Sequence, residues 1–429
     1  MTGFAGLLKN NRNYRYTWLG QVVSEIGDHF NNLAVFSLAM HYGDAGLVLA
    51  TALIARGLPM LIAGPLSGVL LDRWDRKRVM IASDLARAVV GLLFIFCERQ
   101  TNPLLLYLLS ACLMFASPFF TSGRAAILPT IASKDELHTA NSVTLTTQWL
   151  NTAIGAFLGG LSVDRLGYTI AFFLNAMSFL FSAWCISHLR SPLGHFRALR
   201  PRDETHRPHP WTDYKNGLAY IRSQPLILAI LLTGVGWAIG GGAAQVLFSL
   251  FGERVFHRGA TGIGILWGSA AIGLVAGGMF AHWLGQRLNF GSYKKVVAIC
   301  FVAHGLFYVA FSQMASFWVA LVFIGLSRSG SAIASILNNG QVLRHVKDEF
   351  RGRVFSAIET VVWSMMMVSM MAAGVASLHV TPQTIGAWAG SMALLTAVVW
   401  LWADWRGWLP EPAIHAGDID DLEVRGEPA

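Results

Sequence analysis

The sequence predicts an all-α membrane protein of twelve transmembrane helices in two pseudo-symmetric six-helix bundles. Three observations support this prediction. Hydrophobic residues make up 54% of the 429 residues and charged residues only 13%, against about 25% charged in an average soluble chain. Apolar runs recur along the chain, and a bilayer core of ~30 Å is spanned by about 20 helical residues. The longest polar segment then divides these runs six and six.

The expected spans follow the apolar runs in chain order. They lie near residues 16–40, 46–71, 79–97, 103–123, 141–163, 168–188, 226–250, 261–285, 296–312, 316–337, 354–378 and 384–404. The composition excludes a soluble protein, because so few charged residues could not cover its surface. The net charge of +8 is explained by the excess of Lys and Arg in cytoplasmic loops, and no nucleic-acid partner is expected.

The distribution of Lys and Arg predicts the orientation. The N-terminus, the loops after even-numbered spans and the C-terminus hold 25 of these residues, whereas the other loops hold 4. The remaining three, Arg56, Arg87 and Arg328, fall within expected spans. Both termini are therefore expected in the cytoplasm of a multi-pass protein of the cytoplasmic (inner) membrane. Residues 1–15 lack the short apolar core of a cleavable signal peptide.

The predicted domain organisation has four parts. Residues 1–188 form an N-terminal six-helix bundle, and residues 225–408 form a C-terminal one. Residues 189–224 form a cytoplasmic linker, whose tail at 213–223 is expected to be a short amphipathic helix on the membrane surface. Residues 409–429 form an acidic, solvated cytoplasmic tail.

A densely charged hairpin separates the second and third expected spans. It reads Gly68-Val-Leu-Leu-Asp72-Arg73-Trp-Asp-Arg76-Lys-Arg. A degenerate copy, Gly278-Met-Phe-Ala-His282, follows 210 residues later, again after an even-numbered span. A repeat at half the chain length is typical of transporters built from two related halves.

The hairpin resembles the signature loop of the major facilitator superfamily of secondary transporters, with Asp75 where a second glycine is usual. Further segments are similar to the drug:proton antiporter-3 branch, which holds macrolide and enterobactin exporters. They are Ser24-Glu-Ile-Gly27-Asp28, Ala140-Asn-Ser142, Gly217-Leu-Ala-Tyr-Ile-Arg222 and Arg351-Gly-Arg-Val354. The resemblance covers about 400 residues. Gly155-Ala-Phe-Leu-Gly159-Gly160 lacks the proline that many antiporters carry, and the Arg-x-x-x-Gly signature of other branches is missing.

The resemblance implies an alternating-access transporter with a gate at the hairpin. Gly68, Asp72, Arg73 and Arg76 are the expected gating residues. The Asp72 carboxylate would cap the N-terminus of span 354–378 near Ser356, because the first N–H groups of a helix lack partners. Arg76 would hold Asp72 in place.

Charged residues inside the first span indicate proton coupling. Glu25, Asp28 and Asn32 share one helix face near mid-membrane. Ionisable groups at that depth normally face a cavity or a partner. Arg56 is expected to be the only nearby cation, which leaves surplus negative charge and predicts that Asp28, with Glu25 as its modulator, takes up the coupled proton. The alternative is that both acids form permanent structural pairs. Arg56 itself could equally contact an anionic group of the substrate.

Other intramembrane charges have competing interpretations. Asp84 and Arg87, three residues apart, are expected to form an ion pair that supports the hairpin and its gate. Glu359 lies less than two turns inside span 354–378, so a gate role competes with proton binding. A substrate pocket is predicted from Arg56, Asn32, Phe30, Gln148, Trp237 and Gln245, although ordinary helix packing would also explain each aromatic residue.

Small residues four apart predict close helix contacts. The pairs are Gly64/Gly68, Gly155/Gly159, Gly264/Gly268 and Gly273/Gly277. Such spacing lets helix backbones approach, which the rocking of transporter halves requires.

The remaining motifs argue against an enzyme. The sequence has no Gly-x-x-x-x-Gly-Lys-Ser/Thr motif and no nucleophile elbow, and its four cysteines are scattered. No cofactor or metal is expected. The predicted function is proton-coupled export of a small amphipathic organic compound, a drug or a siderophore, by a monomer in the lipid bilayer. The alternatives are transport of a lysophospholipid or other lipid on the same fold, and a non-transporting receptor or scaffold.

The orientation can be tested with one cysteine in the linker. Thr205→Cys, with the four native cysteines replaced, is expected to stay unlabelled in intact cells by a membrane-impermeant maleimide and to be labelled in inside-out vesicles. The same cysteine after detergent treatment is the control for reactivity. Labelling in intact cells would reverse the orientation.

Overall fold

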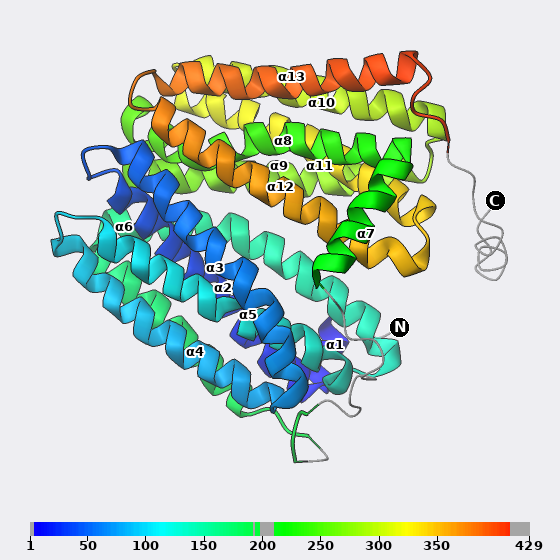
Figure 1. Cartoon of the computed structure of the whole chain (residues 1–429). Helices are drawn as coiled ribbons and strands as arrows, with labels where there is room; N and C mark the ends of the chain where they lie inside the picture. The colour runs from blue at the N-terminus through cyan, green and yellow to red at the C-terminus, as the bar shows by residue number, and fades with distance from the viewer. Residues whose placement is uncertain (1–3, 192–193, 198–209, 412–429) are drawn as a thin grey trace. The chain divides into compact units, whose positions relative to one another are not determined.

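The computed structural model describes residues 4–191, 194–197 and 210–411, and all regular elements in these ranges are helical (Figure 1). The elements are α1 Phe4–Asn10, α2 Arg12–Ala39, α3 Ala45–Arg73, α4 Arg76–Leu93, the 3-10 segment η1 Phe94–Arg99, α5 Leu104–Ile131, α6 Lys134–Ser187, α7 Pro210–Ser223, α8 Pro225–Leu250, the π-helical segment η2 Phe251–Val255, α9 Gly259–Gly285, α10 Phe290–Gln313, α11 Phe317–His345, α12 Asp348–Ala376 and α13 Pro382–Trp405. Much of the predicted linker and nearly all of the acidic tail lie outside the described residues.

Within the described ranges, ten segments are long and apolar enough to cross a membrane. One of them lies in α6, which has 54 residues and a non-helical Gly167 (φ 83°, ψ 171°) near its middle. Only glycine adopts this backbone conformation readily, so α6 contains both of the spans predicted at 141–163 and 168–188. The polar helix α2 is not among the ten. The exact number of twelve therefore stays a prediction.

Several helices extend beyond the predicted spans, and two of these differences affect the first unit. α5 continues to Ile131 rather than ending at 123, so Arg124 lies inside the helix and not in a loop. α6 begins at Lys134, before the predicted start at 141, because Ser133 and Glu136 form a capping box. The Ser133 N–H donates to the Glu136 carboxylate (3.0 Å) and holds the pKa of that group below its usual value.

The chain divides by its contacts into two compact units, and each is described separately. The first comprises residues 1–205, 246–271 and 373–379. In it, α2 packs along α6, α3 packs along α5, and α4 contacts both α5 and α6 (Figure 1). The domain boundaries expected from the sequence stay predictions.

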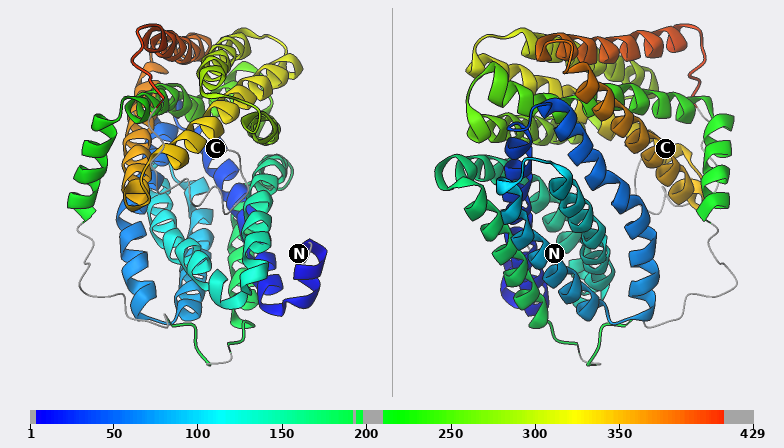
Figure 2. Two further views of the ribbon diagram at one scale, coloured as in Figure 1. Left: turned by 90° about the vertical axis from the view of Figure 1, so that its right-hand side faces the viewer. Right: turned by 60° about the vertical axis from the view of Figure 1, so that its left-hand side comes forward.

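The second unit comprises residues 206–245, 272–372 and 380–429. In it, α10 packs along α11 and α13 (Figure 2). The Trp400 indole of α13 donates to the Lys294 carbonyl of α10 (2.9 Å). Ser369 of α12 donates to the Ile239 carbonyl of α8. The predicted helix at 213–223 is confirmed as α7, whereas its place on the membrane surface stays a prediction.

The two halves of the sequence use the same packing partners. The contacts α2–α6, α3–α5 and the contact of α4 with the second half of α6 correspond in order to α8–α12, α9–α11 and α10–α13. Small residues mediate the last contact of each series: Gly91 lies against Ala176, and Gly305 against Gly390. The repeated pattern supports the internal duplication that the degenerate hairpin copy indicates.

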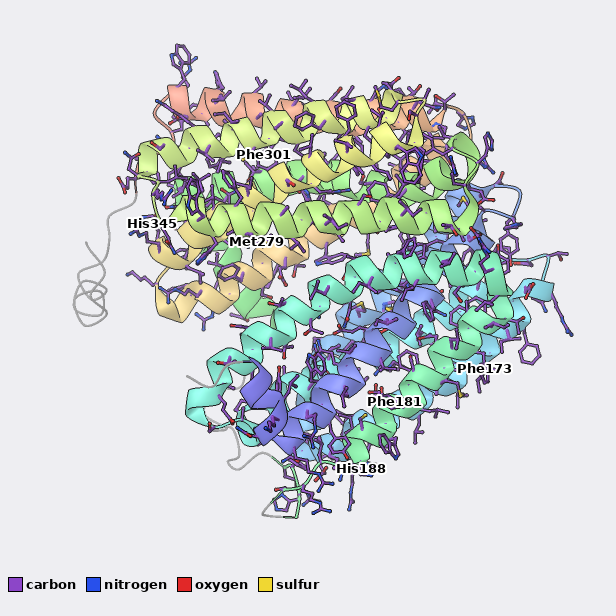
Figure 3. All side chains as sticks on the ribbon, turned by 180° about the vertical axis from the view of Figure 1, so that it is seen from behind. Phe173, Phe181, His188, Met279, Phe301 and His345 are labelled. Carbon is purple, nitrogen blue, oxygen red and sulfur yellow. The ribbon has the colours of Figure 1, made fainter. Side chains whose placement is uncertain are left out.

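Large apolar side chains cover the outer faces of the helices. Phe173 and Phe181 project outward from α6, and Met279 from α9 (Figure 3). Met279 is 66% exposed. An apolar surface of this extent is stable in lipid and not in water. The chain is a multi-pass membrane protein.

Glycines bring α2 and α6 into backbone contact. A Cβ on Gly155 would lie 2.6 Å from the His29 ring, and one on Gly159 would lie 2.7 Å from the His29 carbonyl oxygen. The predicted close approach at this pair is confirmed. It is wrong for Gly64 and Gly68, where a Cβ would meet nothing within 4 Å.

Replacing Gly159 should therefore destabilise the protein much more than replacing Gly64. Gly159→Leu forces the His29 backbone away, and overpacking of this kind costs about 1–3 kcal/mol. Gly64→Leu meets open space and removes a poor helix former. The measurement is the midpoint of thermal unfolding in detergent. Equal midpoints for the two variants would contradict the packing described here.

Candidate functional site

A cluster of charged side chains lies inside the first unit, on α2 and the helices around it. α2 is held against the second half of α6 at Gly27, where a Cβ would overlap the Ser178 hydroxyl. This close approach positions Glu25, Asp28 and Asn32, which share one face of α2 as the sequence predicts.

Arg56 of α3 joins this face through amide groups. Its side chain donates to Oδ1 of Asn31 (3.3 Å) and to Oδ1 of Asn32. Arg56 is only 9% exposed. Its guanidinium also interacts electrostatically with Asp28. The structure thus connects the predicted countercharge to α2, although the direct contacts are to amides and not to a carboxylate.

Asp28 has a carboxyl oxygen that its neighbours leave without a partner. Among the described residues, Oδ1 of Asp28 is buried and accepts no hydrogen bond. The carboxyl lies within electrostatic reach of Arg87, Arg56 and Glu25. These charged groups act on the Asp28 carboxyl through space and no ion pair joins them to it among the described residues, so protonation of Asp28 breaks no ion pair.

Glu25 has direct partners that the sequence analysis missed. Arg124 of α5 pairs with its Oε1 (3.1 Å), and Asn151 of α6 donates to its Oε2 (2.7 Å). The prediction that Arg56 is the only nearby cation is wrong. The apolar residues Ala125–Leu128 after Arg124 are the signal that the helix continues and takes this arginine into the membrane.

Asp84 and Arg87 form the ion pair that was predicted, and both are almost fully buried. The Arg87 guanidinium lies over the rings of Phe120 (4.7 Å) and Phe179 (4.3 Å), contacts that favour a desolvated cation. The pair thus packs against α5 and α6.

The cluster as a whole is electrically balanced. Three carboxyl groups face three guanidinium groups: Glu25, Asp28 and Asp84 with Arg56, Arg87 and Arg124. The predicted surplus of negative charge is wrong for this reason. Glu25 and Asp84 each form an ion pair with an arginine. Asp28 and Arg56 interact only through space. These six residues are called the charge cluster below.

At the hairpin, the predicted gating residues differ in their exposure and in their contacts. Asp72 and Arg73 are exposed at the end of α3. Arg76 donates to the Ala126 carbonyl of α5 (2.7 Å), and no ion pair between it and Asp72 occurs among the described residues, so the predicted support of Asp72 by Arg76 is wrong. Asp75, unassigned from the sequence, caps α4 and accepts from the Phe196 N–H (2.8 Å).

Charged residues of the second unit are less concentrated. Arg328 is buried beside His304 and the ring of Tyr308, and Nδ1 of His304 lies 3.0 Å from the Ser327 carbonyl. Glu359 is exposed, and α12 begins at Asp348. Glu359 therefore lies about 16 Å from the start of its helix, deeper than the predicted two turns.

The predicted substrate residues come from both units. Phe30 and Asn32 of α2 are partly buried, and Gln148 of α6 is exposed. Trp237 and Gln245 of α8 are partly buried. Whether they line one cavity stays a prediction. Within the part of the chain that the structure describes, no group of three or more His, Cys, Asp or Glu side chains could hold a metal ion.

Buried charges among apolar membrane helices define a class of protein, the polytopic transporters, because such groups are costly in a bilayer and mark pathways or proton relays. The chain belongs to one family of such transporters, the Major Facilitator Superfamily, because the family model matches residues 17–370.

Three curated relatives carry the names of export or efflux proteins. A Bacillus subtilis protein named as a bacilysin exporter, BacE, is 25% identical over 348 residues, covering 81% of this chain and 84% of its own. Macrolide efflux protein A of Streptococcus pyogenes is 24% identical, covering 79% and 83%. The enterobactin exporter EntS of Citrobacter koseri is 25% identical, covering 81% of each chain. The predicted resemblance to macrolide and enterobactin exporters is confirmed.

Solved structures agree on the fold. The nucleoside transporter NupG superposes with a TM-score of 0.69, covering 90% of this chain and 99% of its own at 11% identity. At this identity the likeness concerns the fold alone.

The Glu25–Arg124 pair gives a test of the charge balance. Arg124→Gln and Glu25→Gln each leave a poorly solvated charge and should destabilise the protein by about 1–3 kcal/mol, less than for a fully buried pair because both side chains are partly exposed. The double variant removes both charges and should be more stable than the sum of the two single effects implies. Thermal unfolding of all four proteins measures this coupling. Strict additivity would show that the two side chains do not act as a pair.

Proposed function

We propose that the chain is a proton-coupled secondary active exporter that moves a small amphipathic organic compound by alternating access. The observation that carries this proposal is the Asp28 carboxyl, buried in the charge cluster with one oxygen free of hydrogen bonds. A fully bonded carboxylate would have to break an ion pair to take up a proton. Asp28 can do so by changing only its electrostatic interaction with Arg56 and Arg87.

The local geometry suggests how a proton and a substrate exclude one another. When Asp28 is ionised, its free Oδ1 can accept a hydrogen bond from a donor group of the substrate. Arg56, held by Asn31 and Asn32, is available to an electronegative group of the same substrate. A proton on Asp28 competes with the donor group for the carboxyl oxygen, so proton and substrate compete at Asp28, which is the linkage that antiport requires.

The other acids of the charge cluster have positioning roles in this proposal. Glu25 holds α5 and α6 to α2 through Arg124 and Asn151. The Asp84–Arg87 pair supplies a fixed cation beside Asp28. Glu359 is the second candidate for proton binding. Gly68, Asp72 and Arg73 form the proposed cytoplasmic gate, together with Arg76 as a contact to α5.

The relatives support the direction and the substrate class. Their names assign them to export of bacilysin, of macrolides and of enterobactin. These relatives are bacterial, which supports placing this chain in the cytoplasmic membrane. The distribution of Lys and Arg supports placing both termini in the cytoplasm. A drug or a siderophore is the proposed substrate. The alternative functions are transport of a lipid and a non-transporting scaffold.

Asp28→Asn should abolish proton-driven accumulation while leaving substrate binding intact. The measurement is flux in proteoliposomes under an imposed pH gradient, with erythromycin, bacilysin and enterobactin as probes. One pH unit is worth 1.36 kcal/mol, so each proton exchanged sustains up to about a tenfold substrate gradient. The wild type should approach this ratio for at least one probe, and Asp28→Asn should fall to a ratio of one.

Glu98→Gln is the matched control, because Glu98 is exposed in η1 and bonds only the Thr169 side chain among the described residues. It should accumulate the probe as the wild type does. Accumulation by Asp28→Asn would place coupling elsewhere, with Glu359 tested next. A wild type that moves none of the probes but moves lysophospholipid would identify a lipid transporter, and one that moves neither would favour the scaffold.

A further inference from the structure

The beginning of α9 is capped by a side chain from another helix. Oδ1 of Asp164, in α6, accepts from the Ala260 N–H (3.0 Å), and Oδ2 accepts from the Thr261 N–H (2.8 Å). The residues lie 96 or more positions apart in the sequence. Gly259 precedes them with φ +58°, and a Cβ there would lie 3.0 Å from the Asp164 carboxylate. Glycine is thus required both by the backbone and by the approach of the acid.

This cap has a physical consequence that an ordinary N-cap lacks. The first N–H groups of a helix have no partners within it, and the helix dipole favours a negative charge at that end. When the capping residue belongs to the same helix, it stabilises only that helix. Because Asp164 belongs to α6, the same two hydrogen bonds hold α6 and α9 together and are lost if the helices separate.

The contact behind the cap is tight and apolar. A Cβ on Gly160 would overlap the Ala260 carbonyl, and one on Gly264 would overlap the Ala156 carbonyl. Next to these glycines, Leu33, Ala156 and Ile263 form a buried cluster that Trp267 covers.

A second pair of helices meets within the same unit. A Cβ on Gly46 of α3 would overlap the Ser377 hydroxyl of α12, and one on Gly374 would lie 3.0 Å from the Gly46 carbonyl. Both pairs, α6–α9 and α3–α12, join a helix of the first predicted half to one of the second. Tyr168, one turn beyond Asp164, bonds Ser37 near the C-terminal end of α2. By the predicted orientation, this is the extracytoplasmic end of the protein.

We propose that Asp164 is the latch residue of this closure: its carboxylate on the N-terminus of α9 holds the extracytoplasmic end shut, and these two bonds break each time that end opens. The inference rests on the alternating-access function proposed above. It adds a gating residue that lies outside the signature hairpin and at the opposite end of the helices from Asp72. Asp164 does not touch the substrate in this role. It sets the ratio of the closed to the open state.

The expected size of the effect follows from the value of a helix cap. Removing a capping carboxylate changes an equilibrium by roughly two- to thirtyfold. The glycine contacts and the Leu33 cluster remain in the variant, so the protein should still fold and close, but it should open more often.

Cysteine accessibility tests this without substrate or proton gradient. The reporter is Leu33→Cys, with Cys97, Cys112, Cys185 and Cys300 replaced, because Leu33 is 1% exposed behind the cap. Asp164→Ala should raise its rate of labelling by a membrane-impermeant maleimide roughly two- to thirtyfold. The increase should occur in right-side-out vesicles and not in inside-out ones. Asp164→Glu, which keeps the charge, should restore part of the wild-type protection.

Asp44→Ala is the matched control. Asp44 also directly precedes a helix, α3, but its side chain makes no capping hydrogen bond. Its loss should leave the labelling rate unchanged. If Leu33→Cys itself lowers the unfolding temperature, Ile263→Cys in the same cluster is the reporter. Equal labelling of the Asp164→Ala and Asp44→Ala proteins would overturn the latch. Faster labelling of Asp164→Ala in a protein that transports none of the probes would retain the latch and reject the exporter.

Discussion

Charged side chains inside a membrane protein must be neutralised by one another, and the first unit is organised around this constraint. Its charge cluster places three carboxyl groups against three guanidinium groups on α2, α3, α4 and α5. The low-dielectric surroundings make each unpaired charge costly. Two acids are paired directly, and Asp28 is held only through space. The cluster is therefore electrically balanced, and Asp28 is the acid whose protonation breaks no ion pair.

Backbone proximity makes this arrangement possible. α2 carries the polar face, and it reaches its partners because Gly155 and Gly159 of α6 let the backbone of His29 approach. Asn151, one turn before Gly155 on the same helix, then bonds Glu25. The small residues and the polar residues of α6 thus form one contact surface. The rings of Phe120 and Phe179 lie over the Arg87 guanidinium and stabilise its positive charge in a place that water does not reach.

Two carboxylates outside the charge cluster belong to the proposed gates. Asp164 caps α9 from a neighbouring helix, and Asp72 lies at the other end of the first unit in the hairpin that resembles the family signature. A cap between helices is strong enough to bias two states and weak enough to break in each cycle. In the proposed cycle, a cap by Asp164 at one end and a cap by Asp72 at the other would favour opposite states.

The sequence by itself determined the class of protein, because apolar runs of membrane length and the charged hairpin depend on local composition. The stripe of Glu25, Asp28 and Asn32 was also predictable from helical periodicity. Only the tertiary structure decided which charges are partners. Arg124, at the edge of a predicted span, became the partner of Glu25, and Asp164 was not recognised at all. Both interactions join residues about 100 positions apart, and no local pattern encodes which distant helix will supply the opposite charge or the free N–H groups.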